Sequence, residues 1–187
     1  MKLPFSDRQF TTLYADPPWP EYGGGVIKRG ADHHYSLLSV AEIAALGGEV
    51  IRVTAESSHL YLWTTNNYLP AALHVVEAWG FYYKTLITWV KDRFGLGQYF
   101  RGQTEHCIFA VRGNIPYRTR PDGKRAQGTT LLTAPRGEHS VKPESLRDMI
   151  ELVSPVPYLE LFARPRPSLF QGTAWAYWGD EAEKEKP

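Results

Sequence analysis

The sequence predicts an α/β protein, in which a sheet is covered by helices on both faces. Runs rich in β-branched and aromatic residues, such as Phe10 to Ala15, alternate with helical stretches, such as Pro70 to Trp79. The chain has 187 residues, 43% of them hydrophobic, which suits one domain with a buried core. We therefore expect a single domain over residues 1–187, with a charged tail at 180–187 that frays.

Each element has a local signal. The first strand, Phe10 to Ala15, stops at Asp-Pro-Pro, and a long glycine-rich loop follows to residue 38. Ser39 to Glu42 matches a capping box that begins a short helix, and Gly47 with Gly48 is expected to stop it. The later elements are a strand at 59–63, a helix at 70–79, strands at 82–90 and 105–111, a polar stretch to about residue 138, a helix from Pro143, and strands at 158–162 and 174–178.

The order of the elements also indicates where a ligand would bind. In open α/β sheets, ligands bind beyond the carboxyl ends of the strands. The residues that follow Ala15, Trp63, Val90 and Phe162 are therefore the first candidates for a site.

Asp16, Pro17, Pro18 and Trp19 directly follow the first strand. Each proline fixes its own φ and restricts the residue before it, so Asp16 and Pro17 are expected to be extended. The Asp16 carboxylate and the Pro17 carbonyl can then form two acceptors without a competing donor, which fits a planar NH2 group. Orientation toward an electrophile matters for such an amine, because proximity effects can be worth ~7–11 kcal/mol. Trp19 would stack on a base, although a proline-rich strand exit with a core tryptophan is an equally good interpretation of the tetrapeptide alone.

Further blocks accompany this tetrapeptide in a fixed order. They are HLYLWTT (59–65), AWGFYYKTLITWVKD (78–92), GQYFRGQTEHCIFAVRGN (97–114), HSVKP (139–143), YLELFARP (158–165) and AWAYWGDE (174–181). Together they resemble the nucleic-acid adenine N6-methyltransferases related to the catalytic subunit of the eukaryotic mRNA adenosine methyltransferase. The resemblance covers nearly the whole chain, and several spaced blocks are more specific than one.

The resemblance implies transfer of a methyl group from S-adenosylmethionine to N6 of adenine. It implies a Rossmann-like sheet with the catalytic strand early and the cofactor strand late. Lys142 would face the methionine carboxylate, Glu160 and Arg164 would lie near the ribose, and Asp180 would lie near the adenine. The full set of implied cofactor residues is Lys142, Glu160, Phe162, Arg164, Gly179 and Asp180.

Two departures from the family limit this transfer of roles. Pro165-Arg166-Pro167 follows Arg164, where the animal catalytic subunit has a histidine and an asparagine after the proline, so those contacts are not carried over. Asp180 stands where the family often has asparagine, and an ionised aspartate cannot donate as an asparagine does.

On the substrate side, the resemblance implies that Arg101, Glu105 and His106 face the target strand or base. Taken alone, a histidine in a strand is more typical of a packed side chain. Arginines and lysines between 112 and 136 favour contact with phosphates, with a solvated loop as the alternative. The full set of expected substrate-binding residues is Tyr22, Tyr35, Lys91, Arg101, Glu105 and His106.

Composition excludes several classes. The single cysteine, Cys107, excludes an intrachain disulfide and a Cys-paired zinc site, and the histidines lack ligand spacing, so we expect no metal. The single cysteine favours a reducing, cytoplasmic location, and the compact chain is typical of a bacterial or phage-encoded protein. The chain lacks the apolar stretch of a signal peptide or of a membrane span, so we expect no membrane partner. Lys and Arg number 21 against 20 Asp and Glu, so net charge does not identify the partner.

Two other functions stay open. One is methylation of a glutamine side-chain amide in a protein, which presents the same NH2 group. The other is a non-catalytic nucleic-acid-binding subunit of the same fold. Trp19 and the basic stretch at 112–136 favour adenine, and the compact chain favours DNA over RNA. Specificity would come from loops or from a second subunit, so a homodimer or a second subunit is an open alternative.

Overall fold

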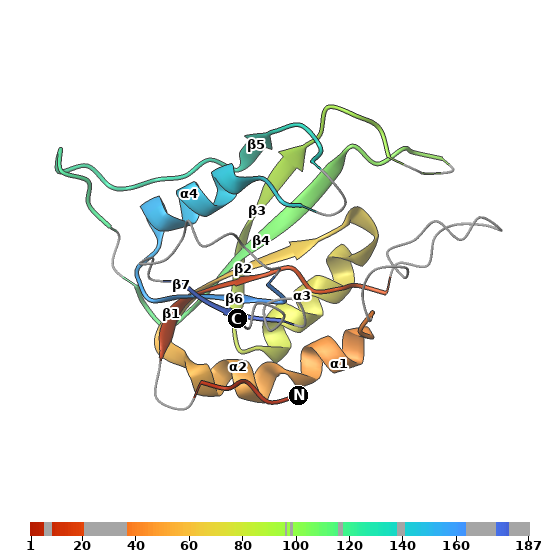
Figure 1. The fold of residues 1–187 in the computed structure, drawn as a ribbon. Coiled ribbons are helices and arrows are strands. Elements are labelled where there is room, and N and C mark those ends of the chain that lie inside the picture. The colour runs from red at the N-terminus through yellow and green to blue at the C-terminus, as the bar shows by residue number, and fades with distance from the viewer. Residues whose placement is uncertain are drawn as a thin grey trace, which may run out of the picture.

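A computed structural model describes residues 1–5, 9–20, 37–95, 97, 99–115, 118–137, 141–163 and 175–179. A seven-stranded sheet in the order β5-β3-β4-β2-β1-β6-β7 runs through the described part of the chain (Figure 1). The elements are β1 (Phe10–Ala15), α1 (Val40–Ala45), α2 (Gly47–Val53), β2 (Thr54–Thr64), η2 (Asn66–Tyr68), α3 (Leu69–Ala78), β3 (Tyr82–Val90), β4 (Thr104–Arg112), β5 (Leu131–Thr133), α4 (Glu144–Val153), β6 (Tyr158–Leu161) and β7 (Trp175–Trp178).

All strands of this sheet except β4 point the same way. β1 is parallel to β2 and β6, β6 is parallel to β7, and β3 is parallel to β5, whereas β4 is antiparallel to both β2 and β3. The carboxyl ends of the parallel strands therefore meet at one edge of the sheet, together with the amino end of β4. We call this edge the carboxyl edge.

Helices cover both faces of the sheet, as the sequence predicts. Side chains alternate between the faces along each strand. Leu13 and Leu159 pack in the cluster formed with α1, α2 and α3, whereas Tyr14 and Tyr158 pack in the cluster formed with α4. Figure 1 shows α4 on the face opposite α1 to α3.

The predicted elements are present, but β2 begins at Thr54, five residues before the expected strand at 59–63, and η2 was not predicted. Two further places differ. The capping box at Ser39 is present, but Gly47 and Gly48 do not stop the helical region. Leu46 ends α1 and at once caps α2, which begins at Gly47. The polar stretch before residue 138 contains β5, which has only three residues and so carries no periodic signal.

Gly47 and Gly48 form a matched pair for testing the packing of α2. A Cβ at Gly47 would overlap the backbone oxygen of Ala78 at the end of α3, whereas a Cβ at Gly48 would meet nothing within 4 Å. We expect Gly47→Ala to lower the free energy of unfolding by about 1–3 kcal/mol through overpacking. Gly48→Ala should raise it by about 0.4–1 kcal/mol by restricting the unfolded chain. Urea denaturation measures both, and shifts of equal sign would contradict this packing.

His59 gives the fold a pH dependence. Its side chain is 9% exposed, its Nδ1 lies 2.8 Å from Ser154 Oγ, and burial lowers its pKa to about 4. Between this value and the ordinary pKa of about 6.5, the unfolded chain binds a proton that the folded chain does not. The free energy of unfolding should therefore fall by roughly 3 kcal/mol as pH falls through this window. His59→Asn should remove this pH dependence, whereas His74→Asn, at an exposed position, should keep it. Urea denaturation at several pH values measures both variants. If the free energy of unfolding of His59→Asn still fell with pH as in the wild type, the assignment to His59 would be wrong.

Candidate active site

Asp16 is the first residue beyond β1, at the carboxyl edge. The chain turns sharply after it, because the Trp19 backbone N–H donates to the Pro17 carbonyl oxygen at 2.8 Å. The Pro18 carbonyl oxygen accepts from the backbone N–H of Leu38 at 3.1 Å. With two fixed proline φ angles, these bonds fix the backbone of Pro17 and Pro18, which directly follow Asp16.

Three charged side chains from separate parts of the chain meet beside Asp16. Lys142, which precedes α4, places its Nζ 2.7 Å from Asp16 Oδ2 and 3.5 Å from Glu105 Oε2. Glu105 lies near the amino end of β4, which reaches the carboxyl edge because β4 is antiparallel. Its other oxygen accepts from Lys91, the residue after β3. We call this alternating set, Asp16, Lys142, Glu105 and Lys91, the charge row.

The charge row is partly shielded from water, with side chains 13% to 28% exposed, which strengthens its interactions. Burial alone would raise the pKa of Glu105, but Lys142 and Lys91 outweigh it and lower that pKa. Burial alone would lower the pKa of Lys142, but the carboxylates of Asp16 and Glu105 outweigh it and raise that pKa. Lys142 and Glu105 are therefore both ionised at neutral pH. The Lys142 ammonium also lies 5.5 Å from the centre of the Trp63 ring, a contact that the sequence did not reveal.

The two acceptors predicted at Asp16 and Pro17 already receive donors. Lys142 donates to Asp16, and the Trp19 N–H donates to the Pro17 carbonyl oxygen, so the expectation of no competing donor is wrong. A carboxylate accepts about four hydrogen bonds and a carbonyl two, so these bonds alone do not saturate either group. Lys142 orients the Asp16 carboxylate, which the sequence did not predict.

Trp19 lies in the core rather than beside an open cavity. Its side chain is 5% exposed, and its Nε1 donates to the carbonyl oxygen of Trp63 at 2.9 Å. Its ring stacks on Tyr68, with centroids 5.7 Å apart and planes at 22°. The structure thus matches the second interpretation of the tetrapeptide, a core tryptophan that anchors the strand exit, and not an open stacking surface for a base.

Glu160 also differs from the implied role. It lies on β6 with its side chain on the α4 face, 6% exposed, and it accepts a hydrogen bond from the Arg147 guanidinium. The Arg147 guanidinium lies 4.1 Å from the centre of the Trp175 ring. Side-chain alternation along β6 places Glu160 on the same face as Tyr158, so its carboxylate serves a buried ion pair instead of a ribose at the carboxyl edge. The position of Arg147 next to Leu146, on the buried side of α4, is a sequence signal that could have predicted a buried arginine in need of a carboxylate partner.

Phe162 and Gly179 follow β6 and β7 at the carboxyl edge. Phe162 has a φ of 59° and its ring packs edge-on against Trp178, with centroids 5.8 Å apart. The Ala163 N–H donates to the Trp178 carbonyl oxygen at 2.9 Å. A Cβ at Gly179 would lie 2.6 Å from the Ala163 nitrogen, so only glycine allows these two strand ends to approach.

The remaining predicted site residues lie elsewhere or outside the described residues. His106 points away from Glu105, and its Nδ1 and Nε2 lie 3.0 Å from Thr88 Oγ1 and 2.8 Å from Asn66 Oδ1, as in a packed histidine. Arg101 donates to the Gly95 carbonyl oxygen in the connection between β3 and β4. Tyr22, Tyr35, Arg164 and Asp180 lie outside the described residues. Among the described residues, no group of three or more His, Cys, Asp or Glu side chains is arranged to hold a metal ion.

The basic stretch at 112–136 is not a single surface at this site. Arg112 donates to the carbonyl oxygen of Ala55 at 2.7 Å, and Arg118 donates to that of Ser154 at 2.9 Å. Both contacts lie toward the amino ends of β2 and β6, at the edge opposite Asp16. By contrast, the Arg136 backbone N–H donates to Asp92 at 2.8 Å, which brings this part of the stretch to the carboxyl edge.

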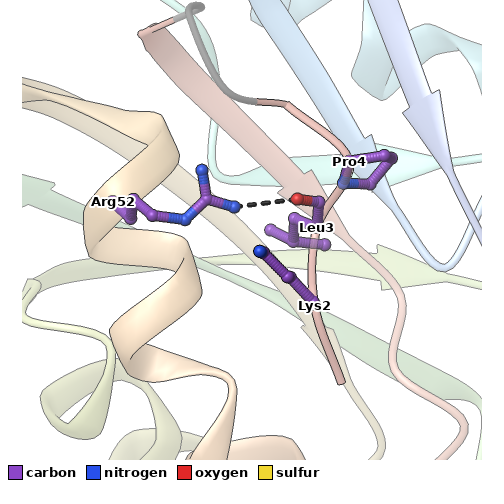
Figure 2. A pocket seen from close by; sticks show the side chains of 4 residues that line it. All are labelled: Lys2, Leu3, Pro4 and Arg52. Atoms are coloured by element: carbon purple, nitrogen blue, oxygen red, sulfur yellow. Dashed lines mark hydrogen bonds between the residues drawn. The ribbon is translucent and has the colours of Figure 1, made fainter.

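A pocket beside α2 does not contain any predicted site residue. Lys2, Leu3, Pro4 and Arg52 line it, and Arg52 donates to the Leu3 carbonyl oxygen at 2.8 Å (Figure 2). None of the described helices has the length and apolar character needed to cross a bilayer.

The charge row is the strongest candidate site in the described part of the chain, because it brings four predicted site residues together.

The sheet and its carboxyl edge define a class of protein. A mixed seven-stranded α/β sheet with Asp-Pro-Pro-Trp after a central strand is the arrangement expected of a Rossmann-like methyltransferase. The chain belongs to the MT-A70 family, whose model matches residues 10–181. The predicted recognition, fold class and enzyme class, an N6-adenine methyltransferase, are confirmed.

Individual relatives agree with this assignment. The Type II methyltransferase M.MunI of Mycoplasma sp is 33% identical over 199 residues, covering 96% of this chain and 80% of that protein. A probable N(6)-adenosine-methyltransferase MT-A70-like of Oryza sativa subsp. japonica is 29% identical, covering 83% of this chain and 21% of that protein. The N(6)-adenosine-methyltransferase MT-A70-like of Arabidopsis thaliana is 28% identical, and the match covers 83% of this chain and 22% of that protein. The chain thus spans most of M.MunI and about a fifth of the plant proteins.

Proposed function

We propose that this protein transfers a methyl group from S-adenosylmethionine to N6 of adenine in DNA. The observation that carries the proposal is the contact between Asp16 and Lys142 at the carboxyl end of β1. DNA is favoured because the similarity covers 80% of a Type II methyltransferase but only about a fifth of the plant adenosine methyltransferases. A cytoplasmic location, and a homodimer or second subunit, stay predictions.

The charge row fits the methionine end of S-adenosylmethionine. That cofactor carries a carboxylate, an ammonium and a sulfonium, and the row offers two cations and two carboxylates in a partly shielded place. When bound, the cofactor supplies a methyl group on a positively charged sulfur. Lys142 would hold its carboxylate, as the resemblance implies. Phe162 and Gly179, beside the row at the ends of β6 and β7, would line the site.

Glu160 does not fit the ribose. Its carboxylate faces Arg147 on the α4 side of the sheet, and removing it from that pair would leave a buried arginine without its main partner. We therefore assign Glu160 to the support of β6 and α4. Arg164 and Asp180 stay predictions, since both lie outside the described residues.

The chain's own residues would orient the amine. The adenine amine is conjugated with its ring and is a poor nucleophile until its lone pair leaves that plane. The Asp16 carboxylate and the Pro17 carbonyl oxygen would accept its two N–H donors, with Lys142 fixing the carboxylate by its 2.7 Å contact. Formation of the new N–C bond would break the bond between the methyl carbon and the sulfur, which would keep the bonding electron pair. The Asp16 carboxylate would stabilise the positive charge that the nitrogen gains. The nitrogen then releases a proton, for which Asp16 is the nearest acceptor in this arrangement.

Label transfer tests the substrate class. The protein would be incubated with S-adenosylmethionine carrying a radioactive methyl group and with duplex DNA, RNA or a protein extract as acceptor. We expect label in DNA that is released by DNase and not by protease. Label that only protease releases would support the glutamine amide alternative and contradict the proposal.

A further inference from the structure

The connection between β3 and β4 presents aromatic side chains to solvent. Tyr99 and Phe100 are 93% and 92% exposed, and Phe94 on the facing arm is 60% exposed. Aromatic side chains of this size are normally buried, and a contiguous exposed group of them marks a binding surface. We define the described residues of this connection, 91–95, 97 and 99–103, as the aromatic ribbon.

The ribbon is held in a defined shape in its described residues. The Lys91 N–H donates to the Gln103 carbonyl oxygen at 2.9 Å, and the Gly95 N–H donates to the Gly102 carbonyl oxygen at 2.6 Å. A Cβ at Gly97 would overlap the Phe100 carbonyl oxygen, so glycine permits a tight turn there. Backbone pairing of this kind fixes Tyr99 and Phe100 near the end of a projecting arm. Figure 1 shows this connection extending beyond the sheet at the ends of β3 and β4.

The ribbon begins at the charge row. Lys91, its first residue, donates to Glu105, which in turn contacts Lys142 and through it Asp16. A substrate that reaches Asp16 therefore passes close to the base of the ribbon.

The charges on the ribbon favour a polyanion. Arg93, with its side chain 81% exposed, and Arg101 flank the aromatic groups, and the Arg101 guanidinium lies 5.5 Å from the centre of the Phe94 ring. Aromatic rings interleaved with arginines form the usual surface for unpaired bases, because rings stack on bases while arginines contact phosphates. Aromatic residues and arginine are also enriched in protein–protein interfaces, so sedimentation of the protein alone is needed to distinguish DNA binding from association of two copies.

We propose that Tyr99 and Phe100 stack on unpaired bases of the DNA close to the target adenine. This inference rests on the proposed function and deepens it. An adenine that leaves its duplex exposes the faces of neighbouring bases, and stacking on those faces would stabilise the open state. The ribbon thereby gives the compact domain a DNA contact separate from the site of methyl transfer.

Equilibrium binding tests the proposal. The probe is a short fluorescein-labelled DNA duplex with a few unpaired bases, and fluorescence anisotropy gives the Kd. Tyr99→Ala and Phe100→Ala should each raise Kd about 5- to 100-fold. Tyr99→Phe and Phe100→Tyr should bind like the wild type because they keep the ring. The control is Tyr82→Ala, which removes an exposed tyrosine at the far end of β3 and should leave Kd unchanged.

Salt dependence and sedimentation separate stacking from other roles. Arg93→Ala should reduce the slope of log Kd against log salt concentration, whereas Tyr99→Ala should leave the slope unchanged. If the Tyr99→Ala/Phe100→Ala double variant bound DNA with the wild-type Kd, the proposal would be wrong. A double variant that sediments differently from the wild type but keeps the wild-type Kd would likewise overturn it, because the ribbon would then serve association of two copies. Failure of the proposed function is distinguishable, because the wild type would then bind this DNA but transfer no methyl group to it.

Discussion

Asp16→Asn should lower the single-turnover rate of methyl transfer by ~100- to 1,000-fold. Asparagine offers one acceptor oxygen and two donors, so it loses the negative charge that stabilises a developing positive nitrogen. Its NH2 group would also face Lys142, which now contacts the Asp16 carboxylate at 2.7 Å. Rapid-quench measurement with labelled S-adenosylmethionine and saturating DNA gives the rate directly.

The matched control for this variant is Asp148→Asn. Asp148 is exposed on α4, so the same chemical change there should leave the rate and the melting temperature unchanged. Asp16→Asn should still fold, since Lys142 keeps Glu105 as a partner. A folded Asp16→Asn variant with the wild-type rate would contradict the role given to Asp16.

Arg147→Met should lower the free energy of unfolding by about 3–5 kcal/mol. The substitution leaves the Glu160 carboxylate buried without its main cation, and an uncompensated buried charge is strongly destabilising. The double variant Arg147→Met/Glu160→Leu should recover most of this loss, because apolar residues of similar volume remove both charges together. Urea denaturation of both single variants and the double variant gives the coupling energy.

An exposed ion pair provides the control. Arg120 and Asp122 lie 3.3 Å apart with side chains that are about half exposed, so their coupling energy should be under ~1 kcal/mol. Additive effects of Arg147→Met and Glu160→Leu would contradict the ion pair seen between α4 and β6.

Much of the fold follows from local pattern. The strand at Phe10–Ala15 and the strand at Tyr82–Val90 have the bounds that their β-branched and aromatic runs predict. The sequence also places Asp16 at a strand end, where the sheet brings it to the carboxyl edge. By contrast, β5 has three residues and forms only through pairing with β3, so no local signal reveals it.

The sequence identified four residues of the candidate site, but it did not identify the contacts between them. Asp16, Lys142, Glu105 and Lys91 are all recognisable as candidates, but they are up to 126 positions apart and their contacts depend on the antiparallel insertion of β4. The burial of Glu160 beside Arg147 likewise depends on which face of β6 meets α4. The spacing of residues within a strand or helix predicts which side chains share a face. It does not predict which residue of another element each side chain will contact.

The central claim is that the Asp16 site methylates the exocyclic amine of adenine in DNA. It is tested most directly by digesting DNA treated with the protein and isotopically labelled S-adenosylmethionine to nucleosides and analysing them by mass spectrometry. The predicted product is labelled N6-methyl-2′-deoxyadenosine, formed by the wild type and lost in Asp16→Asn. Label on cytosine, or labelled N6-methyl-2′-deoxyadenosine at the wild-type level from the Asp16→Asn protein, would contradict it.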